Sequence, residues 1–482
     1  MNVEKTYTMR KIIAFTFASL FFSTIVNAQP NNISKEQKAY ELSVFWKELC
    51  YNFANFDQCP TLNVDSLYRV YFSRVAETQN DYDYYLEMQG FAAHFNNGHT
   101  FCGLPQSLYP YLCTTSLRTK YDNGKVYMSN IGLHNKGAEN IQAGDEIVKI
   151  NGLPAVEYFN RFAVPYVSCS NPENKLQESM FSPYSQCPNR FALVSDNRHL
   201  ILEVMTEKGL RQVTVDFDIY FMPNERQKEH QNNIKWLDTA SHHSKHVDFM
   251  LIPEEKAAYL RLDNCDEQMA KTFFSYWPQI AEQKYFILDL RENLGGDGNA
   301  YSSIIPCLLK EDSLSYSWYG MAKTHNSAKK AWGMAKKLYY DDSEVDEWFK
   351  LNYYPYTDGT AFDTVINPNY QPNPTPKSDR FKGMILVLIG PHTASAAEGL
   401  AITLSQGENV KLVGSKTAGA NGQPLVIPLE SGINLFINSF KSFDFEGQDF
   451  SAGINPDMTF EFEKDSVPEL VRKLIHRHAK YH

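Results

Sequence analysis

The chain has 482 residues, of which 43% are hydrophobic and 21% are charged. This length and composition exclude an intrinsically disordered protein and predict two or three folded domains. A formal charge of −10 at pH 7 argues against nucleic acid or an anionic membrane surface as the partner.

Residues 1–28 have the pattern of a secretory signal peptide. Two basic residues, Arg10 and Lys11, precede an apolar run from Ile12 to Val26, and small residues lead up to Gln29. The apolar run is shorter than the roughly 20 residues that a transmembrane helix needs, so we expect no stable membrane anchor. The pattern therefore predicts export to the periplasm or the extracellular medium.

Eight cysteines follow this segment, and none belongs to a CxxC motif. The histidines do not have metal-ligand spacing either, so we expect neither a zinc ion nor another cofactor. Export would permit disulfides, and the closest candidates along the chain are Cys50 with Cys59 and Cys169 with Cys187. The sequence alone leaves the pairing open, as it does the oligomeric state.

The first predicted domain, residues 29–111, is helical. Apolar residues recur at intervals of three and four in residues 36–54, 64–76 and 82–95. Residues 96–100 then form a glycine-bearing turn that contains His99. Short alternating strands separated by turns follow in residues 112–217 and predict a small β-rich module.

Residues 218–247 are polar and indicate a linker, and residues 248–482 alternate between strand and helix patterns. Such alternation predicts an α/β core with an at least partly parallel sheet. We expect this core to be interrupted by an insertion at about 308–380, which contains a charged helical stretch and a proline-rich loop.

Two strand ends in the core carry the residues of a candidate site. The apolar strand that begins at Met384 leads through a turn into a helix that opens at Ser395, and the strand that begins at Tyr285 ends in the pair Gly295 and Gly296. A serine at a strand-to-helix turn exposes its hydroxyl beside free backbone N–H groups. The pattern indicates a serine hydrolase, with Ala396 N–H and the N–H of Gly295 or Gly296 as oxyanion donors. The alternative for Ser395 is a capping box with Glu398.

A serine nucleophile needs a base, and the base in turn needs an orienting group. His99 is the candidate base because it lies on a loop, where functional residues often lie. Asp449 and Glu446 are the candidate acids, beside the tight turn at 453–457. A surface or structural role is the alternative for each of these three residues.

Four segments together resemble the carboxyl-terminal processing and tricorn-core family of serine peptidases: residues 289–296, 393–398, 414–419 and 453–457. They occur in the family's order and spacing. The resemblance implies a multidomain α/β protein with a helical N-terminal domain, a PDZ-like β-rich module and a ClpP/crotonase-like catalytic core, acting on polypeptides as a tail-specific protease. In the PDZ-like module, Gly144, Asp145 and Ile147 are implied as substrate-binding residues.

One departure from the family favours the tricorn-like branch, in which a histidine like His99 is the base. The processing-peptidase branch has a catalytic lysine after the Thr-x-Gly turn, where this chain has Ala420. Lys416 lies four residues earlier and is a poor substitute. We therefore expect an exported serine endopeptidase that forms an acyl-enzyme on Ser395 with His99 as general base.

Two other functions stay open at this point. An incomplete site would leave an inactive peptidase-like protein that binds peptides through its PDZ-like module. An aromatic content of 14% is the one feature that suggests a glycan-binding protein.

Overall fold

The computed structural model describes residues 32–115, 117–130, 141–181, 188, 190–196, 198–217, 219–221, 249–315, 319–322, 370–422, 424–462 and 465–481. The predicted signal peptide, most of the predicted linker and most of the predicted insertion lie outside these residues. In the part of the chain that is described, no helix is long and apolar enough to cross a membrane.

Three helices form the N-terminal region, as the periodicity predicted: α2 (Lys35–Asn52), α3 (Val64–Glu77) and α4 (Asp81–Ala93). Each begins at a polar cap, and the side chains of Ser34, Asn63 and Asn80 accept hydrogen bonds from the first turns of the three helices. The apolar faces of these helices meet in one buried core.

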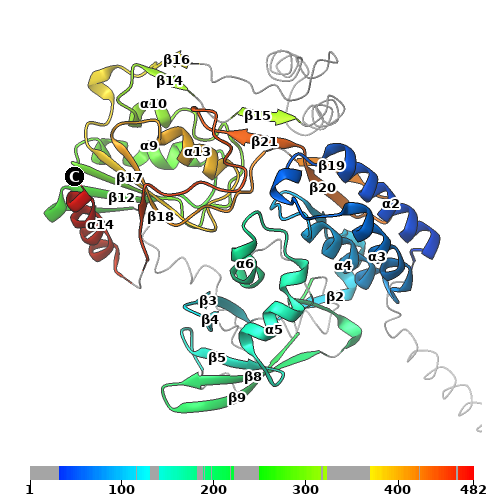
Figure 1. Ribbon diagram of the computed structural model, residues 1–482. Coiled ribbons are helices and arrows are strands. Elements are labelled where there is room, and N and C mark those ends of the chain that lie inside the picture. Colours follow the sequence, from blue (N-terminus) through cyan, green and yellow to red (C-terminus); the bar gives the residue numbers. More distant parts are fainter. Residues whose placement is uncertain are drawn as a thin grey trace, which may run out of the picture.

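Strands from the C-terminal half of the sequence complete this region. Strand β1 (Phe101–Gly103) pairs with β20 (Asn434–Asn438), which pairs with β19 (Pro424–Pro428). Their leucines lie in the same core as α2 and α4, and Figure 1 shows β19 and β20 beside these helices. The sequence did not predict this return of the chain, which brings residues 417–422 to the N-terminal region.

The middle region contains an antiparallel sheet in the order β3-β4-β5-β8-β9, with β6 (Leu153–Pro154) paired to β5. The five strands are β3 (Arg118–Asp122), β4 (Lys125–Asn130), β5 (Glu146–Ile150), β8 (His199–Thr206) and β9 (Gly209–Asp216). Helices α5 (Ala155–Phe162) and α6 (Lys175–Phe181) pack against this sheet. A smaller sheet links it to the N-terminal region and consists of β10 (Ile219–Tyr220), β2 (Leu112–Thr114) and β7 (Phe191–Leu193).

The C-terminal region is built on a six-stranded sheet in the order β11-β12-β13-β17-β18-β22. The strands are β11 (Phe249–Ile252), β12 (Ala257–Arg261), β13 (Tyr285–Asp289), β17 (Met384–Ile389), β18 (Val410–Gly414) and β22 (Met458–Thr459). All pairs after β11–β12 are parallel, which confirms the expected partly parallel sheet. Because β13 and β17 are adjacent, the loops after their carboxyl ends meet at one edge.

Helices cover both faces of this sheet. The core on one face includes α9 (Met269–Ile280), α10 (Ile305–Leu308) and α13 (Ala396–Leu404), and the core on the other includes α14 (Val467–Tyr481). Two short pairings join segments at its periphery: β14 (Ser313–Ser315) with β16 (Tyr370–Pro372), and β15 (Tyr319–Ala322) with β21 (Phe440–Phe443).

The cysteine pairing suggested near the N-terminus is wrong in this structure. Cys50 and Cys59 form no disulfide, and the buried Cys59 thiol donates to the carbonyl of Phe95. Cys169 forms no disulfide either, while its suggested partner, Cys187, lies outside the described residues.

Candidate active site

Ser395 occupies the N-cap of α13 in a backbone conformation that is rare for a residue with a side chain. Its φ is +53° and its ψ is −121°, and such a conformation costs on the order of 1–3 kcal/mol. The neighbouring loop enforces it, because Ala394 N–H donates to the carbonyl of Asn293 at 3.0 Å and the hydroxyl of Thr393 donates to the carbonyl of Leu290 at 2.8 Å. The strain thus lies at the residue that the sequence indicated as the nucleophile.

Gly295 allows the loop after β13 to lie directly against this residue. Its φ is +96°, and a β-carbon there would lie 2.7 Å from Cβ of Ser395 and 2.9 Å from the nitrogen of Ala396. Any side chain at this position would therefore displace the nucleophile or its helix.

The two glycines differ in the availability of their N–H groups. The Gly295 N–H already donates to Oδ1 of Asn293 at 2.9 Å. The N–H groups of Gly296 and Ala396 donate to no acceptor among the described residues. Of the two glycines that the sequence offered, Gly296 is therefore the one with a donor to spare.

Glu398, one turn into α13, is fully buried and surrounded by donors. Oε2 accepts from Ser395 N–H at 3.1 Å, and Oε1 accepts from Gly419 N–H at 2.9 Å and from the hydroxyl of Thr417. Burial raises the pKa of Glu398 to about 7, while these bonds and one from the side chain of Asn421 oppose that rise. The contact with Ser395 is the carboxylate half of the expected capping box, and the other contacts join α13 to the 417–421 segment.

His99 lies on the turn after α4 and points to the same segment of the chain. Its Nδ1 lies 2.7 Å from the carbonyl oxygen of Gly422. Because a carbonyl only accepts hydrogen bonds, Nδ1 carries the proton and Nε2 keeps its lone pair. Burial lowers the pKa of His99, while the carbonyls of Gly422 and Asn421 oppose that effect. The ring is therefore neutral at neutral pH and has the tautomer that a general base needs.

The turn that carries His99 is held in place by its neighbours. Gly98 N–H donates to Oγ of Ser170 at 3.0 Å, and that hydroxyl donates to the carbonyl of Gly419 at 2.5 Å. A β-carbon on Gly98 would lie 2.8 Å from Cβ of Ala420. The His99 turn thus occupies the space beside Ala420, the position at which the processing-peptidase branch has its lysine.

Residues 417–422 are therefore the link between the two candidate catalytic residues. Gly419 N–H donates to Glu398, whose carboxylate also holds the backbone of Ser395. Three residues later, the Gly422 carbonyl accepts the hydrogen bond from His99 Nδ1–H. The sequence did not predict this role for Glu398, although Glu398 was a candidate capping residue.

The structure does not bring the candidate acids to His99. Oδ1 of Asp449 accepts from Ser451 N–H at 2.8 Å and its Oδ2 lies 3.6 Å from Nζ of Lys441, while the exposed Glu446 accepts from Gln448 at 3.0 Å. Among the described residues, neither acid forms a hydrogen bond or an ion pair with His99. The position opposite Nδ1 holds the Gly422 carbonyl instead.

The three candidate substrate-binding residues of the middle region make internal contacts. Gly144 N–H donates to the carbonyl of Met128 at 2.8 Å, and Asp145 N–H to that of Gln142 at 3.1 Å. Ile147 is 1% exposed and belongs to the core of the sheet. These groups are therefore used to build the turn before β5, and their contact with substrate stays a prediction.

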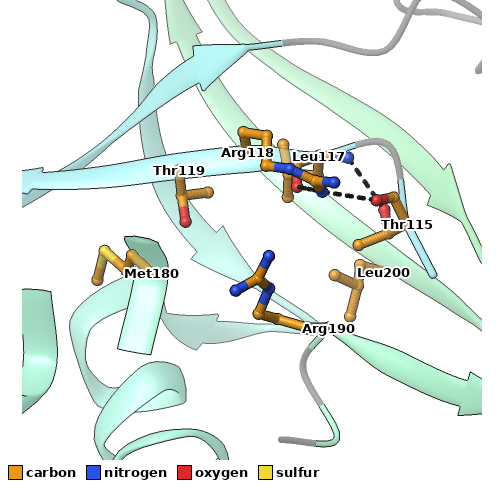
Figure 2. A pocket seen from close by; sticks show the side chains of 7 residues that line it. All are labelled: Thr115, Leu117, Arg118, Thr119, Met180, Arg190 and Leu200. Atoms are coloured by element: carbon orange, nitrogen blue, oxygen red, sulfur yellow. Dashed lines mark hydrogen bonds between the residues drawn. The ribbon is translucent and has the colours of Figure 1, made fainter. Parts of the chain in front are cut away.

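A small cavity opens elsewhere in the middle region, between β3, α6 and β8 (Figure 2). It is lined by Thr115, Leu117, Arg118, Thr119, Met180, Arg190 and Leu200. Arg118 donates to the carbonyls of Thr115 and Leu117, and burial together with the charge of Arg190 lowers its pKa to about 10. The lining includes none of the residues around Ser395 or His99.

Within the described ranges, no group of three or more His, Cys, Asp or Glu side chains is arranged to hold a metal ion. A serine, a neutral histidine and two available backbone donors are chemically suited to acyl transfer without such an ion. That the protein needs no cofactor stays a prediction.

Comparisons with known proteins identify a peptidase domain in the chain. Residues 256–460 match the model of peptidase family S41, and no curated protein matches the chain. Mature CPAF has a similar fold, with a TM-score of 0.65 and 15% identity over 92% of this chain and 98% of that chain. CPAF complexed with lactacystin gives 0.64 and 14% over the same shares. The photosystem II D1 C-terminal processing protease gives 0.43 and 13%, over 88% of this chain and 93% of that chain. At these identities the CPAF matches establish the fold alone.

Proposed function

The chain is a serine-type peptidase with a family S41 domain at residues 256–460, and from that premise we propose that it hydrolyses peptide bonds through an acyl-enzyme on Ser395 with His99 as the general base. His99 lies outside the matched residues, so its role rests on geometry. The observation that carries it is the Nδ1–H bond to Gly422, which leaves Nε2 free to accept a proton.

In the proposed first step, Ser395 Oγ attacks the substrate carbonyl while Nε2 of His99 takes the hydroxyl proton. The negative charge on the carbonyl oxygen is stabilised by the N–H groups of Gly296 and Ala396. When the C–N bond breaks, His99 returns the proton to the leaving amine. His99 then takes a proton from a water molecule, which attacks the carbonyl of the ester. When the ester bond breaks, His99 returns this proton to Ser395 Oγ, and the carboxylic acid product leaves.

In this mechanism the Gly422 carbonyl takes the position that a carboxylate occupies in Ser-His-acid triads. It accepts the Nδ1–H bond and orients the ring, but as a neutral group it stabilises the imidazolium less than a carboxylate would. Glu398 is a positioning residue, because it holds the Ser395 backbone and the 417–421 segment together.

We also propose the finer fold assignments: a PDZ-like module in the middle region, and a ClpP/crotonase-like arrangement of the parallel sheet and its helices. The antiparallel sheet with α5 supports the first, and the adjacent strands β13 and β17 support the second. Contact of a substrate chain with Gly144, Asp145 and Ile147 would be visible as chemical-shift changes on peptide addition.

Export is a further proposal, supported by the pattern of residues 1–28. N-terminal sequencing of protein recovered from the periplasm or the culture medium should begin at Gln29. Protein that keeps these residues and stays in the cytoplasm would contradict it.

Labelling with a fluorophosphonate, followed by intact mass measurement, tests the proposed activity. We expect one adduct, which peptide mapping assigns to Ser395. Folded protein that is not labelled would favour the second candidate, an inactive peptidase-like protein that binds peptides. The observation behind that candidate is that neither Asp449 nor Glu446 contacts His99.

A further inference from the structure

A contact between the middle region and the catalytic loops lies three residues from the nucleophile. His392 is on the loop between β17 and α13, and its Nδ1 lies 3.0 Å from Oε2 of Glu292, on the loop that leads to Gly296. On the other side of the ring, Nε2 lies 3.9 Å from Oε1 of Glu178, on α6. His392 therefore lies between two carboxylates that belong to different regions of the molecule.

The three side chains differ in exposure, so solvent screens the His392–Glu178 pair and the His392–Glu292 pair to different degrees. The side chains of Glu178 and His392 are 15% and 11% exposed, whereas that of Glu292 is 43% exposed. Charge interactions are weakly screened where solvent is excluded. The interaction of Glu178 with His392 is thus the less screened one, and it crosses from α6 to the loop of Ser395.

The surroundings of Glu178 make its charge costly. Burial raises the pKa of Glu178 to about 6, the positive charge of a protonated His392 opposes that rise, and the charge of Glu292 adds to it. The charge of Glu178 also acts on Cys169, whose thiol donates to the carbonyl of Asn171. Lys175 precedes Glu178 by three residues on α6, and its Nζ donates to the carbonyl of Ala93. Glu178 is therefore a carboxylate held in a costly position against the catalytic loops.

We propose that Glu178 is a positioning residue that, through His392, couples α6 of the middle region to the two loops that carry Ser395 and Gly296. The loops are already joined to each other by His392 and Glu292 and by the Ala394–Asn293 backbone bond. Through its interaction with His392, Glu178 restrains these loops from α6, which lies outside the catalytic core. A substrate that shifts α6 would then alter the spacing of nucleophile and oxyanion donors. The proposal rests on the proposed function of Ser395.

The test compares wild type with Glu178→Gln, with Glu173→Gln as the matched control. Glu173 lies five residues earlier, just before α6, and is exposed. With a small fluorophosphonate and a small ester substrate at pH 7.5, we expect Glu178→Gln to lower the labelling rate and kcat about five- to tenfold, with KM unchanged and Glu173→Gln at the wild-type rate.

Stability separates positioning from loss of fold. Because the folded-state pKa of Glu178 is raised from 4.5 to about 6, its ionisation lowers stability as the pH rises from 4.5 to 6. The full cost is present above about pH 6, and a neutral amide removes it. Glu178→Gln should therefore unfold at the same temperature as wild type or higher at pH 7.5, while it reacts more slowly. Below pH 6 the wild-type carboxyl is itself neutral, so the difference between the two labelling rates should narrow.

Hydrogen exchange measured by mass spectrometry tests the coupling without relying on activity. We expect faster exchange in residues 290–296 and 391–397 of Glu178→Gln, and no change in Glu173→Gln. The coupling is overturned if hydrogen exchange in these loops is the same in Glu178→Gln as in wild type. It is also overturned if wild type is labelled and Glu178→Gln is labelled at the same rate. Wild type that is never labelled refutes the proposed function instead, and the exchange data then decide the coupling alone.

Discussion

The nucleophile and the base of this site are built in opposite ways. Ser395 is shaped within the catalytic core, by a turn between β17 and α13 and by the adjacent loop that ends in Gly295 and Gly296. His99 comes from the N-terminal region and is oriented by the carbonyl of Gly422, which is 323 residues away in the sequence. A locally built residue tolerates changes elsewhere in the chain, whereas an assembled one depends on contacts between regions.

We expect the largest loss of activity when the nucleophile is substituted. Ser395→Ala should abolish fluorophosphonate labelling and peptide cleavage, because no acyl-enzyme forms. The melting temperature should change little, since alanine keeps the same strained backbone. Residual labelling at another residue, mapped by peptide mass, would show that the nucleophile is elsewhere.

The base side predicts a large but incomplete loss. His99→Ala should reduce kcat about 100- to 10,000-fold, the usual contribution of a general base, and leave the oxyanion donors in place. The double variant with Ala420→Lys should not recover activity, because the Gly98 turn occupies the space beside Ala420. Recovery in the double variant would mean that the Ser-Lys arrangement is accessible to this fold. Labelling of His99→Ala at the wild-type rate would move the base elsewhere, with Lys416 next to test.

We expect an intermediate loss of activity when Glu398, which links the Ser395 loop to the segment that contacts His99, is substituted. Glu398→Gln replaces one acceptor oxygen by an amide that faces the donors of Ser395, Gly419 or Thr417. Unsatisfied buried donors cost about 1–3 kcal/mol each, so we expect a free energy of unfolding lower by that amount and a labelling rate at least tenfold lower. Chemical denaturation and labelling kinetics measure both, and normal stability with normal labelling would exclude the link.

The smallest effect is on the pH profile. Because burial lowers the pKa of His99, its neutral form persists below the ordinary value, and the acidic limb of kcat/KM should lie below pH 6.5. Glu178→Gln should keep this limb, because the limb reports the titration of His99 and the substitution removes a different titrating group. A limb above pH 6.5 would contradict a buried neutral histidine as the base.

Much of the fold was predictable because its signals are local. The three N-terminal helices and the alternating core strands follow from periodicity and cap residues, which act over a few residues. The return of β19 and β20 to the N-terminal region was not predictable, since their apolar pattern does not say which core they join. The role of Glu398 was half visible, because its contact with Ser395 spans one helical turn and its contacts with Thr417 and Gly419 do not.

By itself the sequence determined where Ser395 and the glycine pair lie, because adjacent parallel strands bring their carboxyl ends together and the turn chemistry is local. The tertiary structure decided the rest of the site. It gave Gly296 rather than Gly295 the available N–H, and it put a carbonyl rather than Asp449 or Glu446 against His99. The physical reason is that each of these outcomes depends on which hydrogen bonds are already taken, and that is fixed only when distant segments pack against one another.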